Sequence, residues 1–301
     1  MTTATAPVLS PSPLRAWFLA TRPRTLTAAL APVSVGSAIA FREGHFVPLT
    51  ASIALLGALL IQIGTNLAND AFDFQKGADT AERQGPPRAT QQGWLTPRQV
   101  LTGAMLCFAA AFLVGLYLVA VAGWPILLVG LISIAAGYAY TGGPFPLAYN
   151  GLGDAFVFVF FGLVAVGGTQ FVQSQHVTLL ALLSGAAIGA LGVALLSVNN
   201  LRDEVSDRKV GKLTLVARFG QRFGRAEWLL SVAFAFAVPV ILVATQTASS
   251  WVLLSWLAVP LSMKPLKTVF TATGAALNAA LAATAKLQLV FGLLLALGLC
   301  Q

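Results

Sequence analysis

Residues 177–209 read VTLLALLSGAAIGALGVALLSVNNLRDEVSDRK, an apolar run that ends in a cluster of charges. Residues 177–200 are long enough to span a membrane once, because a spanning helix needs about 20 mainly apolar residues. On a helix, Asp203 and Asp207 share a face with Asn199, since residues four apart are neighbours. The segment therefore predicts a membrane helix whose polar end presents an amide and two carboxylates.

Apolar runs of this kind recur along the chain. The composition agrees with them: 57% of the residues are hydrophobic and only 9% are charged, against about 25% charged in an ordinary soluble domain. This excludes a soluble enzyme, a disordered protein and a secreted disulfide scaffold. The predicted spans lie at approximately 25–41, 48–68, 99–122, 124–141, 153–173, 177–200, 226–246, 249–263 and 285–300.

The predicted fold class is therefore an all-α membrane protein, with about nine transmembrane helices in one bundle. We expect residues 1–20 to form a short polar N-terminal tail and residues 21–301 to form a single transmembrane domain. Segment 264–284 is rich in Ala and Thr and extends one or other of its neighbours.

The basic residues predict the orientation. With the N-terminus in the cytoplasm, 17 of the 18 Lys and Arg residues fall on the cytoplasmic side and only Arg42 falls outside. The positive-inside rule requires such an asymmetry. It also accounts for the net charge of +8 without a nucleic-acid partner, and we expect no nucleic acid and see no evident protein partner.

A second polar helix end precedes the first by about 130 residues. Residues 62–79 read QIGTNLANDAFDFQKGAD, in which Asn66, Asn69, Asp70 and Asp73 share a helix face. A single Asp at such a position is more often solvated or paired with a nearby cation. Two clusters at membrane depth favour a polar cavity instead, because carboxylates there are costly and face a polar interior.

Oxygen ligands in two clusters are the donors that Mg²⁺ uses when it also holds substrate phosphates. Basic side chains beside them would bind the remaining phosphate oxygens. Together they suggest a site, open to the cytoplasm, for a diphosphate on an apolar tail. The flanking basic residues are Lys76, Arg88, Arg202, Lys209 and Lys212.

At these residues the chain resembles the UbiA superfamily of intramembrane aromatic prenyltransferases. Asn69-xxx-Asp73 and Asp203-xxx-Asp207 match the two family motifs. Gly77 stands where the family has a further Asp, and Asp79 is the next acid. Within the superfamily the chain is similar to the bacterial 1,4-dihydroxy-2-naphthoate polyprenyltransferases of menaquinone synthesis, along residues 21–32, 62–89, 140–147, 151–154, 199–212 and 284–289.

The resemblance implies transfer of a polyprenyl group from an allylic diphosphate to 1,4-dihydroxy-2-naphthoate, with loss of CO2 and diphosphate. It also implies a multi-pass enzyme of the bacterial cytoplasmic membrane. The implied Mg²⁺ ligands are Asn69, Asp73, Asp79, Asp203 and Asp207. The implied diphosphate ligands are Asn69 and the five basic residues above, and the catalytic candidates are Asp73, Asp203, Asp207, Tyr140 and Asp154.

Some roles stay open at this level. Tyr138 and Tyr140 either stabilise a carbocation or belong to the aromatic belt of a membrane interface. Asp154 either positions or deprotonates the aromatic substrate, or complements a helix N-terminus. Arg22 is a topology anchor or a substrate ligand.

Rival functions are a secondary transporter, which places its ionisable residues near the midplane, and a Mg²⁺-dependent phosphatidyltransferase of the CDP-alcohol type. A prenyltransferase acting on 4-hydroxybenzoate or haem is the rival within the superfamily.

Overall fold

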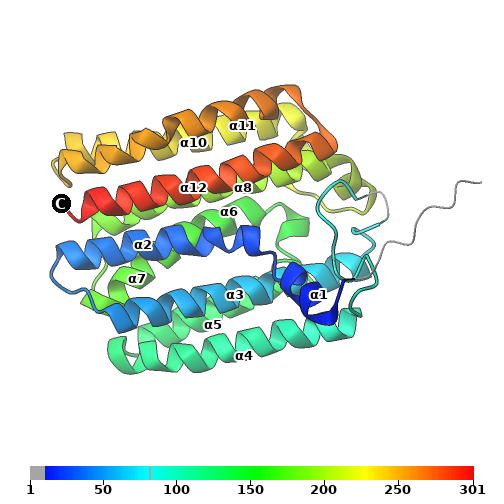
Figure 1. Cartoon of the computed structure of the whole chain (residues 1–301), viewed down its shortest axis with the longest axis horizontal. Coiled ribbons are helices and arrows are strands. Elements are labelled where there is room, and N and C mark those ends of the chain that lie inside the picture. The colour runs from blue at the N-terminus through cyan, green and yellow to red at the C-terminus, as the bar shows by residue number, and fades with distance from the viewer. Residues whose placement is uncertain (1–10, 81–82) are drawn as a thin grey trace, which may run out of the picture.

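The computed structural model describes residues 11–80 and 83–301, which form a bundle of helices and contain no strand (Figure 1). The predicted all-α class is confirmed. The elements are α1 (Pro13–Ala20), η1 (Pro23–Thr25), α2 (Thr27–Arg42), α3 (Pro48–Gln75), α4 (Pro97–Ala122), α5 (Trp124–Ala139), η2 (Ala148–Asn150), α6 (Gly153–Val157), the π-helix η3 (Phe158–Val164), α7 (Ala165–Ser174), α8 (Leu179–Lys209), α9 (Leu215–Phe219), α10 (Gln221–Ala244), η4 (Ser250–Ala258), α11 (Val259–Thr271), η5 (Gly274–Leu277) and α12 (Asn278–Leu299).

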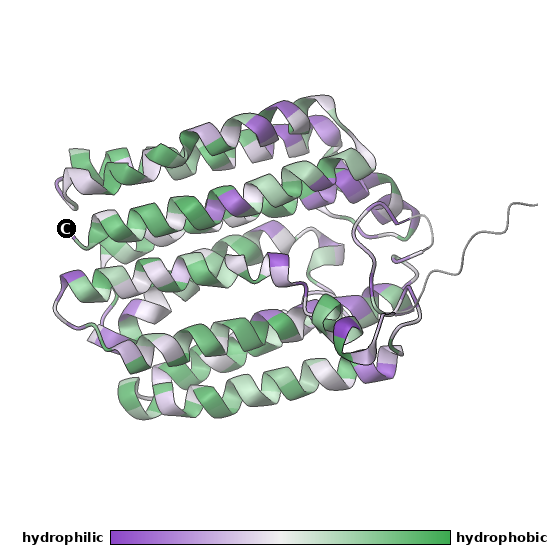
Figure 2. Ribbon diagram, viewed as in Figure 1, coloured by the Kyte–Doolittle hydropathy of each residue, from purple (hydrophilic) through white to green (hydrophobic). Residues whose placement is uncertain are grey.

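Hydrogen bonds between connections show that successive long helices run in opposite directions. At one end, Lys76 Nζ donates to Thr141 O at 2.6 Å and Asn278 Nδ2 donates to Gln84 O at 2.8 Å. At the other end, Val47 N donates to Gln173 Oε1 at 3.1 Å. The first end, which we call the polar end, carries connections 76–96, 140–152, 210–214 and 272–277. Hydrophilic residues gather there, on the side of α1 (Figure 2).

Six helical segments in the described part of the chain are long and apolar enough to cross a membrane. A seventh arises if α1–η1 and α2, bent by 50° at their junction, count as one span. The predicted count of nine is not confirmed. Helix α5 has only 16 residues, and the predicted span 249–263 is a 3₁₀ stretch, η4, that continues into α11. The six segments are α3, α4, Gly153–Ser174, α8, α10 and Gly274–Leu299.

Helix α1 lies within the segment predicted as an N-terminal tail. Ser12 caps it by accepting a hydrogen bond from Arg15 N at 3.4 Å. Ala16 and Ala20 are buried in one cluster with Leu67 of α3, whereas Leu14 is exposed. The helix therefore packs one face onto the bundle at the polar end. Residues 1–10 of the predicted tail lie outside the described residues.

Glycines let the π-helix η3 pack closely on α8, the most buried of the candidate spans. A Cβ added to Gly162 would lie 2.5 Å from Gly185 O, and one added to Gly189 would lie 2.5 Å from Phe158 O. Both neighbours are backbone atoms and cannot move aside alone. Small residues are typical of such contacts because they let membrane helices approach each other.

We expect Gly162→Ala to destabilise the protein by about 1–3 kcal/mol, the usual cost of overpacking. Thermal unfolding in detergent measures it. Gly115→Ala on α4 is the matched control, since its Cβ would meet nothing within 4 Å. Equal melting temperatures for the two variants would contradict the role of this contact.

Candidate active site

The ends of α3 and α8 meet at the polar end around a cavity of about 20 Å³. Both helices continue past the predicted spans, α3 to Gln75 and α8 to Lys209. Asp73, Asp203 and Asp207 therefore lie on the last turns of these helices, whereas Asp79 lies in the connection that follows α3. The charged residues that line the cavity are Asp73, Asp79, Arg83, Arg88, Asp203, Asp207 and Lys212, and Asn199 and Ser206 lie among them.

Two arginines balance the acids of the first cluster. Asp73 is 3% exposed and accepts a hydrogen bond from Arg88 Nη2 at 3.2 Å. Asp79 forms ion pairs with Arg83 and, at 3.2 Å, with Arg88 Nε. Burial raises the pKa of Asp79 to about 6, although Arg83 acts in the opposite direction.

Gly77 explains how Asp79 reaches this cavity. Its φ of 72° is left-handed, and the chain turns back there as Ala78 N donates to Asp73 O at 2.8 Å. Glycine adopts this conformation at a helix C-terminus without a Cβ penalty. Gly77 thus lets the chain turn so that the acid two residues later reaches the same cavity.

The second cluster is held by Arg202 and Lys212. Arg202 donates to Asp203 from Nε at 2.8 Å and from Nη2 at 2.5 Å, and its Nη1 donates to Asn278 Oδ1 at 3.0 Å. Lys212 Nζ lies 3.5 Å from Asp207 Oδ1. Burial lowers the pKa of Lys212, but Asp73 and Asp207 outweigh it, so the pKa lies above its ordinary value.

Four residues predicted for the metal and diphosphate do not line the cavity. One is Arg202, which reaches it only through Asp203. Asn69 Oδ1 accepts a hydrogen bond from Thr141 Oγ1 at 2.7 Å, and Lys76 donates to the carbonyl of the same Thr141. Both therefore lie beside the cavity. Lys209 is exposed at the end of α8.

Asp70 and Asn66 support the site from the back of α3. Asp70 accepts hydrogen bonds from Ala89 N at 3.0 Å and Thr90 N at 3.3 Å, which fastens the loop that carries Arg88. Asn66 Nδ2 donates to Thr21 O at 3.0 Å. The helix face identified in the sequence is thus divided: Asp73 faces the cavity, and Asp70 binds backbone.

The cavity fits a divalent ion by its chemistry. Its ligand atoms are oxygens, which suit Mg²⁺. Asp79 Oδ2 and Asp207 Oδ2 are buried and accept no hydrogen bond, although Arg88 is paired with the former. As the side chains stand, no three His, Cys, Asp or Glu groups of the described residues converge on one metal position.

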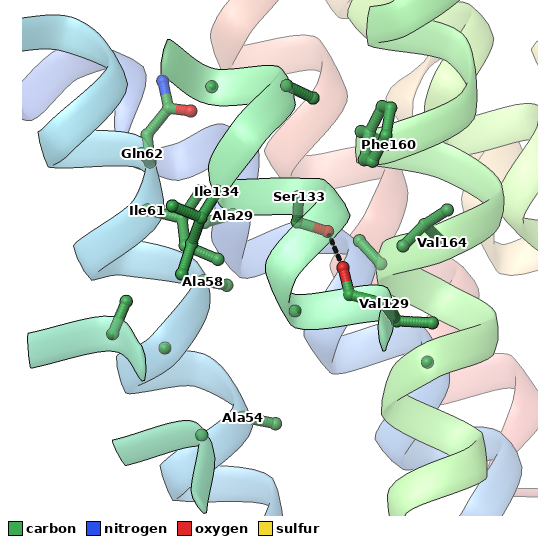
Figure 3. Close-up of a pocket in the computed structure, with 18 of the residues that line it drawn as sticks. Ala29, Ala54, Ala58, Ile61, Gln62, Val129, Ser133, Ile134, Phe160 and Val164 are labelled. Carbon is green, nitrogen blue, oxygen red and sulfur yellow. Dashed lines mark hydrogen bonds between the residues drawn. The ribbon is translucent and has the colours of Figure 1, made fainter. Parts of the chain in front are cut away.

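A much larger apolar cavity of about 240 Å³ lies deeper in the bundle, between α2, α3, α4, α5, η3 and α7 (Figure 3). Ala54, Ala58 and Gln62 of α3 form one wall, and Phe160 and Val164 of η3 lie across from it in Figure 3. Tyr140 lines this cavity too and interacts electrostatically with Asp73 of the charged cavity. The apolar cavity therefore has room for an apolar chain near the charged site.

Comparison with known proteins identifies the family. A model of the UbiA prenyltransferase family matches residues 29–290. The chain belongs to the UbiA prenyltransferase family. It is 38% identical to the 1,4-dihydroxy-2-naphthoate octaprenyltransferase of Haemophilus influenzae, over 95% of this chain and 96% of the relative. It is also 38% identical to the Escherichia coli enzyme of that name, over 95% of each chain.

A solved structure has the same fold. The UbiA homologue from Archaeoglobus fulgidus, bound to GPP and Mg²⁺, superposes with a TM-score of 0.64 over 92% of this chain and 98% of that chain, at 14% identity. At this identity the likeness supports the fold alone.

In this UbiA family member, Tyr140 and Asp154 lie beside each other at the start of α6. Tyr140 lines the large cavity, and a Cβ added to Gly153 would lie 3.0 Å from its hydroxyl. Asp154 is 6% exposed, and its Oδ1 accepts no hydrogen bond. Glu227 of α10, which sequence reasoning missed, interacts electrostatically with Asp154.

Three other residues of the site were missed or underrated. Arg83 was missed although it lines the small cavity and pairs with Asp79. Tyr149 donates to Asp73 Oδ1 at 3.0 Å; burial and this carboxylate raise its pKa, so the phenol stays a proton donor. Arg22 has a left-handed φ of 53°, a buried Nη2 without a hydrogen bond, and electrostatic interactions with Asp70, Asp79 and Asp73. Neither a long-range contact from a loop nor a positive φ has a signal in the sequence.

We expect Asp70→Ala to destabilise the protein by about 1–3 kcal/mol, because it leaves two buried backbone N–H groups unsatisfied. The loop around Arg88 should then be cut sooner by protease. Limited proteolysis and thermal unfolding in detergent measure both effects. Gln91→Ala, which removes one hydrogen bond to Thr80 O in the same loop, is the control, and equal behaviour of the two variants would contradict the role of Asp70.

Proposed function

We propose that this chain transfers a polyprenyl group from an allylic polyprenyl diphosphate to 1,4-dihydroxy-2-naphthoate, with release of CO2 and diphosphate. The product is demethylmenaquinol. The observation that carries the proposal is that Tyr140 links two cavities. It lines the apolar cavity, and it interacts electrostatically with Asp73 and Asp207, which line the charged one. The naphthoate acceptor is supported by the relatives of that name at 38% identity.

The residues of the small cavity would hold Mg²⁺ and the diphosphate. Its acids supply the metal's oxygens, with Asn69 beside them. Bound Mg²⁺ would neutralise the negative charge that grows on the departing diphosphate. The basic residues stabilise the same charge by charge-assisted hydrogen bonds. The metal ligands proposed are Asp73, Asp79, Asp203 and Asp207, and the diphosphate ligands are Arg22, Lys76, Arg83, Arg88, Arg202 and Lys212.

The reaction forms one carbon–carbon bond and breaks two bonds. The allylic C–O bond breaks, and its electron pair leaves with the diphosphate. The carboxyl-bearing carbon of the electron-rich naphthoate ring then attacks the allylic cation. The carboxylate then leaves as CO2, and the electrons of that bond restore the aromatic ring. We assign Tyr140 to stabilising the cation through its ring and Asp154 to orienting a hydroxyl of the acceptor.

The position of the acids disfavours a secondary transporter. Transporters place such residues near the membrane midplane, whereas here they lie at the polar end. We also propose that the enzyme resides in the bacterial cytoplasmic membrane with this end toward the cytoplasm. The support is the positive-inside rule, since most of the basic residues lie in the connections of the polar end and in the helix ends beside them.

Membranes that contain the protein should prenylate 1,4-dihydroxy-2-naphthoate when given a radiolabelled polyprenyl diphosphate and Mg²⁺. Extraction and chromatography of the lipid product measure the reaction, and EDTA should abolish it. Turnover of 4-hydroxybenzoate with none of the naphthoate would reject the proposed acceptor.

Asp73→Ala and Asp203→Ala should each lower turnover at least about 100-fold, because each removes a metal oxygen. Asp203→Ala also leaves the buried Arg202 without its carboxylate partner. The initial rate of product formation measures the loss. Both variants should still insert into membranes and unfold cooperatively on heating. An active Asp73→Ala or Asp203→Ala protein would refute the metal assignment.

The apolar cavity should determine how well long tails bind. Ala54→Phe places a ring in its wall and should raise KM for a long polyprenyl diphosphate about tenfold, the equivalent of an overpacking cost of about 1.4 kcal/mol. KM for dimethylallyl diphosphate should change little. Leu56→Phe is the control, since Leu56 is 46% exposed on the same helix and does not line the cavity. If Ala54→Phe affects both substrates equally, the tail lies elsewhere.

A further inference from the structure

Tyr149 lies in the connection between α5 and α6, where backbone contacts fix its position. Leu213 N donates to Tyr149 O at 3.0 Å. The next residue is fastened as well, since Arg218 Nη2 donates to Asn150 O at 3.0 Å. The connection after α5 is thereby joined to the one that follows α8.

The side chain of Tyr149 contacts groups from both acidic helix ends. Its hydroxyl donates to Asp73 Oδ1 at 3.0 Å. Lys76 Nζ lies 4.5 Å from the centroid of its ring, and Lys212 Nζ lies 5.5 Å from it. Because Lys212 also pairs with Asp207 at 3.5 Å, one tyrosine connects the acids of α3 with those of α8.

The hydroxyl and the ring make different contributions. The hydroxyl fixes one oxygen of Asp73, and outer hydrogen bonds of this kind orient metal-binding carboxylates. The ring attracts both ammonium groups but adds no negative charge of its own, so it does not compete with an anion for their positive charge. Two lysines can thus stay close together and keep their charge for an anion.

We propose that Tyr149 is a positioning residue with two separable functions. Its hydroxyl orients Asp73 for Mg²⁺, and its ring holds Lys76 and Lys212 for the diphosphate. The inference rests on the function proposed above. It extends that function to a residue that does not line the apolar cavity and has not been assigned a contact with the substrate.

Two substitutions separate the functions. Tyr149→Phe removes the hydroxyl and keeps the ring, whereas Tyr149→Leu removes both. The readout is the binding of an unreactive geranyl thiodiphosphate to the purified full-length protein in detergent, measured by calorimetry. Two quantities are taken: the Mg²⁺ concentration at half-saturation, and the Kd of the analogue at saturating Mg²⁺.

For Tyr149→Phe we expect the Mg²⁺ half-saturation to rise about tenfold, while the Kd of the analogue changes less than about twofold. For Tyr149→Leu we expect the same rise in Mg²⁺ requirement and, in addition, an analogue Kd about fivefold higher, since two cation–π contacts are lost. Tyr117→Phe is the matched control. Tyr117 lies on α4, and its hydroxyl is hydrogen-bonded at 3.3 Å to the hydroxyl of Thr50 on α3. Removal of this hydroxyl should change neither the Mg²⁺ half-saturation nor the Kd of the analogue.

A wild-type Mg²⁺ half-saturation in Tyr149→Phe would overturn the inference. If Tyr149→Phe only lowers the melting temperature of the metal-free protein and leaves the Mg²⁺ half-saturation unchanged, the role of the hydroxyl is merely structural and the inference is wrong. Wild-type protein that binds the analogue but shows no activity with a naphthoate acceptor would refute the proposed acceptor and leave Tyr149 supported. Wild-type protein without Mg²⁺-dependent binding would refute the proposed function and this inference together.

Discussion

Buried carboxylates at the ends of α3 and α8 must be neutralised, and the polar end is built around this requirement. Moving an ion out of water costs several kcal/mol even after the protein relaxes. Asp73 and Asp203 are less than 10% exposed, and each is held by an arginine, Arg88 or Arg202. Arg88 lies in the connection that follows α3, whereas Arg202 lies on α8 itself.

The arginines that neutralise the acids are also suited to bind the substrate. An arginine fork binds a carboxylate or a phosphate with the same geometry. A diphosphate that arrives with Mg²⁺ brings both an anion for the arginines and a cation for the acids. Binding can therefore replace the arginine–carboxylate pairs by arginine–diphosphate and Mg²⁺–carboxylate pairs. No buried charge is left unpaired, so the diphosphate and Mg²⁺ can enter the small polar cavity without that energetic cost.

Hydropathy and helical spacing were sufficient to predict the class of fold and the two acidic helix ends. Asp73, Asp203 and Asp207 line one cavity because each lies at a fixed spacing on a helix that the sequence identifies. The spacing did not distinguish Asp73 from Asp70, whose partners are backbone groups of a distant loop. It also gave no sign of Tyr149, because its place depends on a backbone hydrogen bond from Leu213, 64 positions later in the chain. The predicted count of nine spans is not confirmed. Residues 250–271 are divided between 3₁₀ and α geometry, and hydropathy gives no sign of that division.

The π-helix Phe158–Val164 determines how α6 and α7 are rotated relative to each other within one span. A π-turn holds one residue more than an α-turn, so it offsets the helix before it from the helix after it by about 100°, one residue's rotation. Asp154 lies at the polar end because it begins the span. The offset sets the side to which it points while Gly168 of α7 faces the apolar cavity. A single-residue deletion within η3 would restore α geometry and turn Asp154 to a different neighbour. The site thus depends on the rotation of α6 relative to α7, and not only on the length and hydropathy of the span.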